Sequence, residues 1–490
     1  MNYTHQKQQL IRIYTIGGML SPSALYRLIQ KLKYFGLKTF HFGSRQDILF
    51  PFPQEFREDE VQEELQDLGL PFEIFQHKNH NIVSTFVTEG YLPGTPWVHA
   101  DTYQFILDEF MECPGLKVNI IDPNQQLVPW FSGNLNFLAS NQENDWHLFF
   151  RNPEDDQLIE FPYLIDGFSI AEVAQILSKE YTEGEMWTSS ASIEAILERH
   201  HLISGRKTPF NFRGEKGPIP QYEGFQRMPD GKYWLGLYWR NNAYDIDFME
   251  AMCQLCAETA VGKIGITPFK SFILQGIAEK YYTQWFRLLG KFGINPNHSA
   301  LELNWHVPVL DQEAQDLKRY LVKVFDQNDI NISGLTFTVA TVPVDPFTTI
   351  CIQQNPSRHQ AIQSPPTYHL YATRDFHPAS LQYQLVKSSI LKEDLPAEIF
   401  ALSKKYFDSW EAEPQLRAKE DTPTDQSRQL HQCPDCLTVY DPAFGDLSAP
   451  EPVAEGTPFE ALPDDYCCSL CQNPMDNFIL RSFSIQNSKV

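Results

Sequence analysis

The stretch that decides how the C-terminal end folds is Cys433-Pro434-Asp435-Cys436, followed further along by Cys468-Ser469-Leu470-Cys471. Residues 437–467 separate these two Cys-x-x-Cys pairs, which can close four thiolates around one tetrahedral metal ion. Four sulfur ligands leave no position for a substrate, so iron there would cycle between Fe(II) and Fe(III), whereas zinc would hold structure. The spacing alone leaves iron and zinc open.

The segment that contains both pairs is acidic and aromatic. No Lys or Arg occurs from Cys433 to Leu480, whereas nine Asp and Glu residues do. Zinc ribbons are often basic and face nucleic acid, but an acidic segment with an aromatic core suits docking onto a basic redox partner. The composition therefore favours iron.

With these residues in view, the segment resembles a rubredoxin. The motifs that carry the resemblance follow one another in that family's order: Tyr440-Asp441-Pro442, Gly445-Asp446, Gly456-Thr457-Pro458-Phe459 and Leu462-Pro463-Asp464-Asp465. The resemblance implies one iron ion bound by Cys433, Cys436, Cys468 and Cys471, and transfer of single electrons.

The segment departs from rubredoxins at several positions. Rubredoxins usually have Gly directly after the second and fourth cysteines, where the backbone needs positive φ, and Leu437 and Gln472 stand there instead. A non-Gly residue in that conformation costs about 1 kcal/mol. Tyr466 and Ser469 replace the usual Trp and Pro. We expect these changes to preserve the ligands and to shift the reduction potential through hydrogen bonds to the sulfurs.

The cysteine content and the net charge indicate the cellular compartment and the classes of partner. Five of the nine cysteines lie at 433–436 and 467–471, which indicates metal ligands in a reducing compartment rather than disulfides. Cys467 is the odd one, and we expect no ligand role for it. The formal charge of −23 disfavours nucleic acid and anionic membrane as partners, although solubility alone also explains it. No signal peptide or long apolar run is evident, so we expect a cytoplasmic protein.

A repeat organises the chain before these cysteines. Residues 10–16 alternate as a strand does, and Ser21-Pro22 begins a helix. The same pattern recurs after a shift of 224 residues, and Asn replaces Gly at the turn, where it tolerates positive φ best after glycine. The matched residues are Ile11 with Leu235, Ile13 with Leu237, Gly17-Gly18 with Asn241-Asn242, and Ile48-Leu49 with Phe272-Ile273.

The repeat also bears on a third cysteine pair. Cys253-x-x-Cys256 looks like another metal pair, but the shift places its cysteines where the first repeat has Ile29 and Leu32, on a helical apolar stripe. Free cysteine packs as a small apolar residue. We therefore expect both cysteines in a helix core.

The patterns together predict an α+β fold. Near the end of the repeated body, helices are expected at Ala379–Ser389 and Glu398–Trp410. The expected domains are 1–80 and 226–300 as ferredoxin-like half-domains, 81–225 and 301–410 as larger α+β domains, 411–430 as a linker, and 431–482 as the rubredoxin-like domain.

The body resembles the sirohaem-containing nitrite and sulfite reductases. The residues that carry this are Leu20-Ser21-Pro22, Gly36, Gly43-Ser44-Arg45-Gln46-Asp47 and Ile266-Thr267-Pro268-Phe269-Lys270. The resemblance implies duplicated ferredoxin-like half-domains in a nitrite- and sulfite-reductase-like body. It also implies that Arg45 contacts a tetrapyrrole carboxylate or an anion.

The body departs from those reductases in its cysteines. They hold a [4Fe-4S] cluster with two further cysteine pairs. Here only Cys113, Cys253, Cys256 and Cys351 precede the linker, with no such spacing, so we expect no cluster.

The basic residues of the body give no clear site. A carboxylate-rich tetrapyrrole needs several converging arginines, and a solvated surface explains each candidate better than a role in binding. Neither His77 and His80 nor His200-His201 have the spacing of metal ligands, so we expect them at the surface or at helix ends. The arginine candidates are Arg45, Arg151, Arg206, Arg213 and Arg240.

The sequence thus predicts an electron-transfer protein. A single Fe(Cys)4 centre would be tethered to a reductase-like scaffold and would deliver electrons between redox proteins in nitrite or sulfite assimilation. Two alternatives stay open. One is a reductase that binds sirohaem or another tetrapyrrole and is fed by its own rubredoxin domain, and the other is an interaction protein stapled by zinc.

Overall fold

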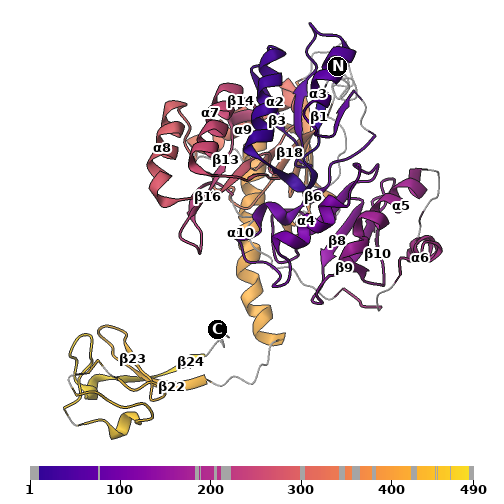
Figure 1. Ribbon diagram of the computed structural model, residues 1–490. Helices are drawn as coiled ribbons and strands as arrows, with labels where there is room; N and C mark the ends of the chain where they lie inside the picture. Colours follow the sequence, from indigo (N-terminus) through magenta and orange to yellow (C-terminus); the bar gives the residue numbers. More distant parts are fainter. Residues whose placement is uncertain are drawn as a thin grey trace. The chain divides into compact units, whose positions relative to one another are not determined.

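A computed structural model describes most of the chain, in two compact units, Met1–Phe407 and Asp408–Val490 (Figure 1). Within the described part, no helix has both the length and the apolar character that crossing a membrane requires. The described residues are 10–75, 78–182, 187, 189–203, 207–210, 222–297, 304–340, 348–355, 365–377, 382–420, 427–446, 448–449, 451–463 and 465–484.

The first half-domain is an antiparallel sheet covered by one helix. β1 (Leu10–Ile13) lies between β4 (Ile48–Pro51) and β5 (Phe72–Ile74), and β3 (Thr39–Phe42) follows β4. The covering helix, α2 (Pro22–Tyr34), begins where the Ser21 hydroxyl accepts the Ala24 N–H at 3.1 Å. Its apolar stripe is buried, as the helical spacing predicted, and comprises Leu25, Leu28, Ile29 and Leu32.

The second half-domain repeats this arrangement. β13 (Tyr233–Leu237), α7 (Ile246–Thr259), β15 (Ile264–Ile266) and β16 (Phe272–Ile277) take the places of β1, α2, β3 and β4, and β12 (Gly224–Arg227) pairs with β13 at the sheet edge. The predicted duplication is confirmed.

The two repeats, related by the 224-residue shift, have positive φ at equivalent backbone positions. Four residues with positive φ in the first half have counterparts with positive φ in the second half. These pairs are Gly17 (70°) with Asn241 (59°), Gly18 (77°) with Asn242 (56°), Gly36 (73°) with Ala260 (58°), and Gln46 (57°) with Lys270 (60°). Cys253 and Cys256 are buried in α7, so the expectation that they belong to a helix core is also confirmed.

The two half-domains exchange strands. β2 (Met19–Leu20) pairs with β15 in the second sheet, and β14 (Tyr244–Asp245) pairs with β3 in the first. The side chain of Asn242 accepts from the Phe42 N–H at 3.0 Å and donates to the Phe42 carbonyl at 2.8 Å. α2 packs against α7 (Figure 1). Each sheet is therefore completed only by the other half.

A larger α+β domain follows each half-domain. In the first, β6 (Val83–Ser84), β7 (Val118–Ile121) and β8 (Leu135–Ala139) are parallel, and β9 (Asp145–Arg151) and β10 (Leu158–Glu160) continue the sheet antiparallel. β11 (Ile165–Asp166) also pairs with β9. The helices associated with this part are α4 (Ala100–Asp108), α5 (Ile170–Thr182) and α6 (Ser190–Arg199), whereas α3 (Glu58–Gln66) packs beside α2 in the first half-domain.

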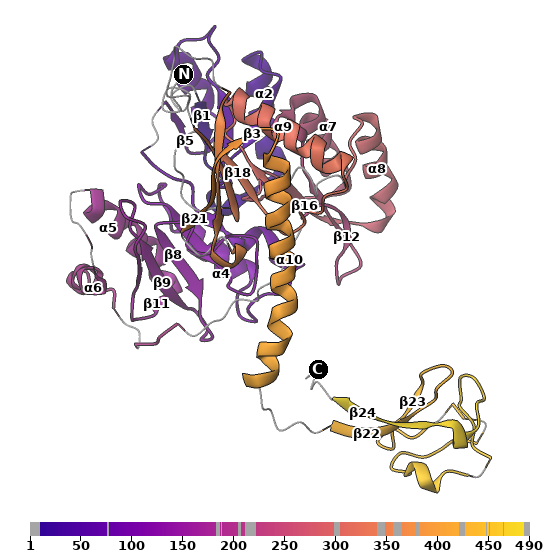
Figure 2. The same ribbon diagram turned by 180° about the vertical axis from the view of Figure 1, so that it is seen from behind.

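The second α+β domain has the same strand order. Two parallel pairings, of β17 (Trp305–His306) with β18 (Phe337–Ala340) and of β18 with β19 (Ile350–Asn355), are followed by the antiparallel strands β20 (Thr367–Thr373) and β21 (Tyr383–Leu391). α9 (Gln312–Gln327) packs on β18 (Figure 2). The remaining helices of the second half are α8 (Tyr282–Lys291) and α10 (Leu395–Glu420).

Two expectations about the end of this body were wrong. The helix predicted at Ala379–Ser389 is the edge strand β21, because pairing with β20 overrides the local apolar spacing; residues 378–381 lie outside the described part. The helix predicted to end at Trp410 continues to Glu420, into the predicted linker. Strong helix formers such as Glu411, Ala412 and Leu416 favour this extension, even with Pro414 among them.

Substituting Gly17 and Gly36 separates close packing from backbone strain. Both have positive φ, where alanine costs about 1–2 kcal/mol. A Cβ on Gly17 would also meet Leu107 Cδ1 at 2.3 Å, whereas one on Gly36 would meet nothing within 4 Å. We expect Gly17→Ala to lower the melting temperature clearly more than Gly36→Ala, which serves as the matched control. Equal losses in thermal unfolding would contradict this packing.

Candidate metal centre

The second unit is a small sheet around an aromatic core. β22 (Ser427–Gln432) lies between β23 (Val439–Tyr440) and β24 (Ile479–Ser484), with both pairings antiparallel. The Tyr466 hydroxyl donates to the Asp446 carboxylate at 2.8 Å, and Tyr440 donates to the Thr457 carbonyl at 2.8 Å. The buried residues of this core are Tyr440, Ala449, Val453, Phe459, Leu462 and Tyr466.

The two cysteine pairs sit in two knuckles with the same backbone. In the first, the Leu437 N–H donates to the Cys433 carbonyl at 3.0 Å and the Cys433 N–H donates to the Thr438 carbonyl at 2.9 Å. In the second, the corresponding bonds join Gln472 to Cys468 at 2.8 Å and Cys468 to Asn473 at 2.9 Å. Leu437 and Gln472 have φ of 65° and 61°, so the predicted positive φ is confirmed.

These knuckles bring the four cysteine sulfurs together. The ligand atoms of Cys433, Cys436, Cys468 and Cys471 all lie within 4.8 Å of one another. The sulfurs of Cys433 and Cys471 are 3.4 Å apart, as are those of Cys436 and Cys468. A tetrahedron with metal–sulfur bonds of about 2.3 Å has edges of about 3.8 Å, so the donor set fits one metal ion.

Burial raises the pKa of these thiols, whereas hydrogen bonds from N–H and O–H donors lower it. Burial opposes ionisation of Cys433, but the backbone N–H groups of Cys436 and Asp435 outweigh it and hold the Cys433 pKa below its usual value. The hydroxyl and then the backbone N–H of Thr438 lower the pKa of Cys436 to about 6.

The last thiol resists ionisation. The Asn473 N–H favours the Cys471 thiolate, yet desolvation and the neighbouring cysteines together raise its pKa to about 12. Four thiolates in this space therefore need a cation to balance their charge, which is what a bound metal ion supplies.

One edge of the site reaches the surface. Within each knuckle the first cysteine is buried, whereas Cys436 is half-buried and Cys471 is exposed. Leu437 and Leu470 flank these cysteines with exposed fractions of 62% and 72%. Cys467, as expected, does not belong to the four-sulfur group.

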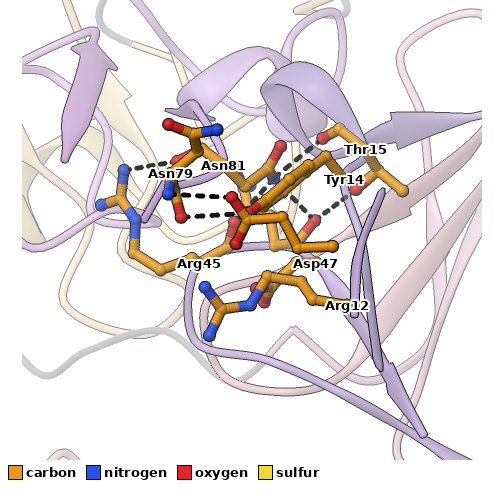
Figure 3. A network of polar contacts seen from close by, with 9 residues as sticks. Arg12, Tyr14, Thr15, Arg45, Asp47, Asn79 and Asn81 are labelled. Carbon is orange, nitrogen blue, oxygen red and sulfur yellow. Dashed lines mark hydrogen bonds and ion pairs between the residues drawn. The ribbon is translucent and has the colours of Figure 1, made fainter. Parts of the chain in front are cut away.

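In the first unit, Arg45 lies in the turn between β3 and β4. Its guanidinium donates to the Asn119 side-chain oxygen at 2.5 Å and to the Asn81 and Val118 carbonyls at 2.7 and 2.6 Å. Figure 3 shows Arg45 with Asn81, whose side-chain amide donates back to the Arg45 carbonyl at 2.7 Å. Burial lowers the pKa of Arg45 to about 9. Arg45 thus joins the half-domain to the following α+β domain.

Arg45 also lines a cavity of about 260 Å³. Its other charged or titratable lining residues are Arg12, Asp47, His80, Lys117 and Lys270, and Arg12 pairs with Asp47 at 3.0 Å. The sequence analysis did not predict Arg12 or Lys117 as site residues. The feature that could have indicated them is a basic residue within or beside an apolar strand.

The cavity does not fit a tetrapyrrole. Pockets that enclose drug-sized ligands measure about 300–1,000 Å³, and a tetrapyrrole is larger than most such ligands. The Nη atoms of Arg45 already donate to three protein oxygens. No step is therefore assigned to a tetrapyrrole in this cavity, although its lining suits a small anion.

Of the other described candidates of the first unit, His80 lines the cavity and is half-buried, whereas Arg151, Arg240, His200 and His201 are not among its lining residues. Arg151 is buried and pairs with Asp156 at 2.6 Å, and Arg240 is exposed. Arg206, Arg213 and His77 lie outside the described residues. His200 caps the C-terminal end of α6, and His201 directly follows it and is exposed, in agreement with the expected helix-end and surface roles.

The cysteines of the first unit are buried, and two of them, Cys253 and Cys256, lie in an apolar core. Cys113, Cys253 and Cys351 are buried, and burial raises the pKa of each to about 12. Among the described residues, the only group of three or more metal-ligating side chains is the one in the second unit.

A four-thiolate site on a small aromatic-cored sheet defines a four-cysteine metal protein, whose ion is iron or zinc. A sequence model of the rubredoxin family matches residues 430–478. Rubredoxin-1 of Chlorobaculum tepidum is 36% identical over 64 residues, which cover 13% of this chain and 90% of that protein. The probable rubredoxin HupI of Bradyrhizobium diazoefficiens is 48% identical over 48 residues, covering 10% and 67%. The chain belongs to the rubredoxin family through this unit, which uses iron for electron transfer.

The rest of the chain has a known fold. The structure of the Mycobacterium tuberculosis NirA protein matches 80% of this chain and 79% of its own, with a TM-score of 0.62 and 15% identity. At that identity the likeness shows the fold alone. The predicted fold class, a nitrite- and sulfite-reductase-like α+β body with a C-terminal rubredoxin domain, is confirmed.

Replacing single cysteines tests the ligand set. Cys436→Ser and Cys471→Ser each remove one thiolate, so we expect loss of most of the iron and of the ferric-thiolate absorption. Cys467→Ser, one residue from a ligand, is the matched control and should keep one iron per chain. Metal analysis and visible spectra measure both. Full iron content in Cys436→Ser, or its loss in Cys467→Ser, would refute the assignment.

Proposed function

We propose that this protein delivers single electrons from its rubredoxin iron to a redox partner, with the reductase-like unit positioning that partner in nitrite or sulfite assimilation. The observation that carries the proposal is the exposed edge of the iron site. Cys471 is exposed and Cys436 half-buried, while the other two ligands are buried. An electron can leave there without crossing the domain.

The surface beside this edge suits a protein partner. Leu437, next to Cys436, and Leu470, next to Cys471, are exposed large apolar residues, with exposed fractions of 62% and 72%. An apolar contact that excludes water, surrounded by charge, is typical of protein interfaces. Since no Lys or Arg lies between Cys433 and Leu480, the surface is acidic and complements a basic partner.

The linkage of the two units supplies proximity. A partner bound to the reductase-like unit would meet the iron at a high effective concentration, because both units belong to one chain. The pathway rests on the fold of the first unit, and function does not follow from fold alone. Its test is therefore direct electron delivery.

Tethered delivery predicts that removing the iron unit slows a partner's reduction. We expect the full chain to reduce a nitrite or sulfite reductase faster than a chain truncated after Glu420, measured by stopped-flow absorbance with an excess of electron donor. Adding salt should slow the reaction, because screening weakens acidic-to-basic docking. Cys467→Ser serves as the control that keeps iron and tether.

The proposal fails if deleting residues 421–490 leaves electron delivery to every candidate reductase unchanged. A rate that salt does not alter would reject the acidic docking surface, while leaving the iron assignment intact.

A second candidate function rests on the basic cavity of the first unit. Arg12, Arg45, Lys117 and Lys270 line it, against one carboxylate, in a chain of formal charge −23. Burial is the main cause that lowers the pKa of Lys270 to about 7, and nearby Lys318 lowers it further. This lining suits a small oxyanion, which supports anion binding by the scaffold as a second proposal.

Anion binding in the cavity should depend on pH. Because the folded pKa of Lys270 is about 7, its positive charge is present below pH 7 and lost above it. We expect nitrite, sulfite or sulfate to raise the melting temperature at pH 6 and to do so less at pH 8. Lys270→Met should remove this dependence, and Lys280→Met, outside the cavity, should keep it. An anion effect unaltered in Lys270→Met would exclude the site.

A further inference from the structure

The two knuckles carry polar side chains at equivalent positions. Thr438 follows Leu437 in the first knuckle, and Asn473 follows Gln472 in the second. Each has the same backbone role, since its carbonyl accepts the N–H of the first cysteine of its own knuckle. This bond uses only the backbone carbonyl, so the side chains of Thr438 and Asn473 can form other hydrogen bonds.

Both side chains contact ligand sulfurs. The Thr438 hydroxyl lies 3.1 Å from the sulfur of Cys436, within its own knuckle. The Asn473 side-chain N–H donates across to the sulfur of Cys433, in the other knuckle, at 3.6 Å. One neutral donor thus faces each cysteine of the first pair, in addition to the backbone N–H groups.

A third residue fixes the direction of the Asn473 amide. The Asn477 side chain donates to the Asn473 side-chain oxygen at 2.7 Å. Because that oxygen receives a hydrogen bond, the nitrogen of the same amide is turned toward Cys433. Asn473 is 8% exposed, so water competes little for its N–H.

We propose that Thr438 and Asn473 set the reduction potential of the iron centre by donating side-chain hydrogen bonds to two ligand sulfurs, with Asn477 as a positioning residue. On reduction, one electron from an external donor converts Fe(III) to Fe(II), and no bond to the ligands forms or breaks. The site gains one negative charge, part of which lies on the sulfurs. Donors to sulfur stabilise the more negative state more strongly, so they raise the potential.

The size of the effect follows from charge-assisted hydrogen bonding. A bond to a charged group contributes more than one to a neutral group, but only its difference between the two oxidation states moves the potential. We expect the loss of either donor to reduce the equilibrium constant for reduction about three- to tenfold. A tenfold change corresponds to about 59 mV for one electron.

The inference rests on the iron centre, not on the identity of the partner. A potential is measured without any partner, so failure of tethered delivery would leave it standing. It also concerns side chains that the cysteine spacing does not determine.

The test is a redox titration of the full iron-loaded chain with dithionite and mediators. Thr438→Val and Asn473→Ala should each lower the potential, and Asn477→Ala should lower it less. Thr438→Ser restores the hydroxyl and should restore the potential. Thr457→Val is the matched control, because its hydroxyl donates to the Ala454 carbonyl at 2.7 Å, away from the sulfurs.

A second readout does not use redox chemistry. In the zinc-loaded chain, the side-chain amide protons of Asn473 should show a shifted, slowly exchanging NMR signal that Asn477→Ala weakens. If Asn473→Ala does not retain iron, the reduction potentials of Thr438→Val and Asn477→Ala still test the proposal. Unchanged potentials in Thr438→Val and Asn477→Ala, with full iron content, would overturn the proposal.

Discussion

Four thiolates can share one small space only when a cation balances their charge. In this chain the two knuckles bring four sulfurs within 4.8 Å, and desolvation together with the neighbouring cysteines raises the pKa of Cys471 to about 12. The fold of the second unit and the metal therefore depend on each other. The surrounding N–H and O–H donors reduce the cost of that charge, and the site reaches the surface at the half-buried Cys436 and the exposed Cys471.

In the first unit, the fold depends on the exchange of strands between the two half-domains. β2 completes the second sheet and β14 completes the first, so neither repeat is a finished sheet alone. The repeat keeps positive φ at four matched positions although the side chains differ. At one such pair, Gln46 and Lys270, the backbone conformation is the same but a neutral side chain is replaced by a basic one. Only the second half therefore contributes a buried lysine to the cavity from this position. The duplicated scaffold thus holds an asymmetric site.

Much of this could be predicted because the signals are local. The metal ligands followed from cysteine spacing, the duplication from a 224-residue shift, and the burial of Cys253 from its place on a helical stripe. The misses concern tertiary effects. β21 is a strand because β20 pairs with it, and local spacing cannot reveal a partner. The cavity gathers Arg12, Lys117 and Lys270 from distant parts of the chain, and only the fold brings them together.

The strained knuckle residues connect stability with function. Leu437 and Gln472 occupy positive φ where glycine would cost less, by about 1 kcal/mol each. Stability alone would therefore favour glycine at both. Leu437 instead places an apolar side chain, 62% exposed, beside the ligands through which an electron would leave. A side chain there can exclude water from the sulfurs and contact a partner, neither of which glycine can do. The strained backbone at Leu437 thus carries an exposed apolar side chain directly on the metal knuckle.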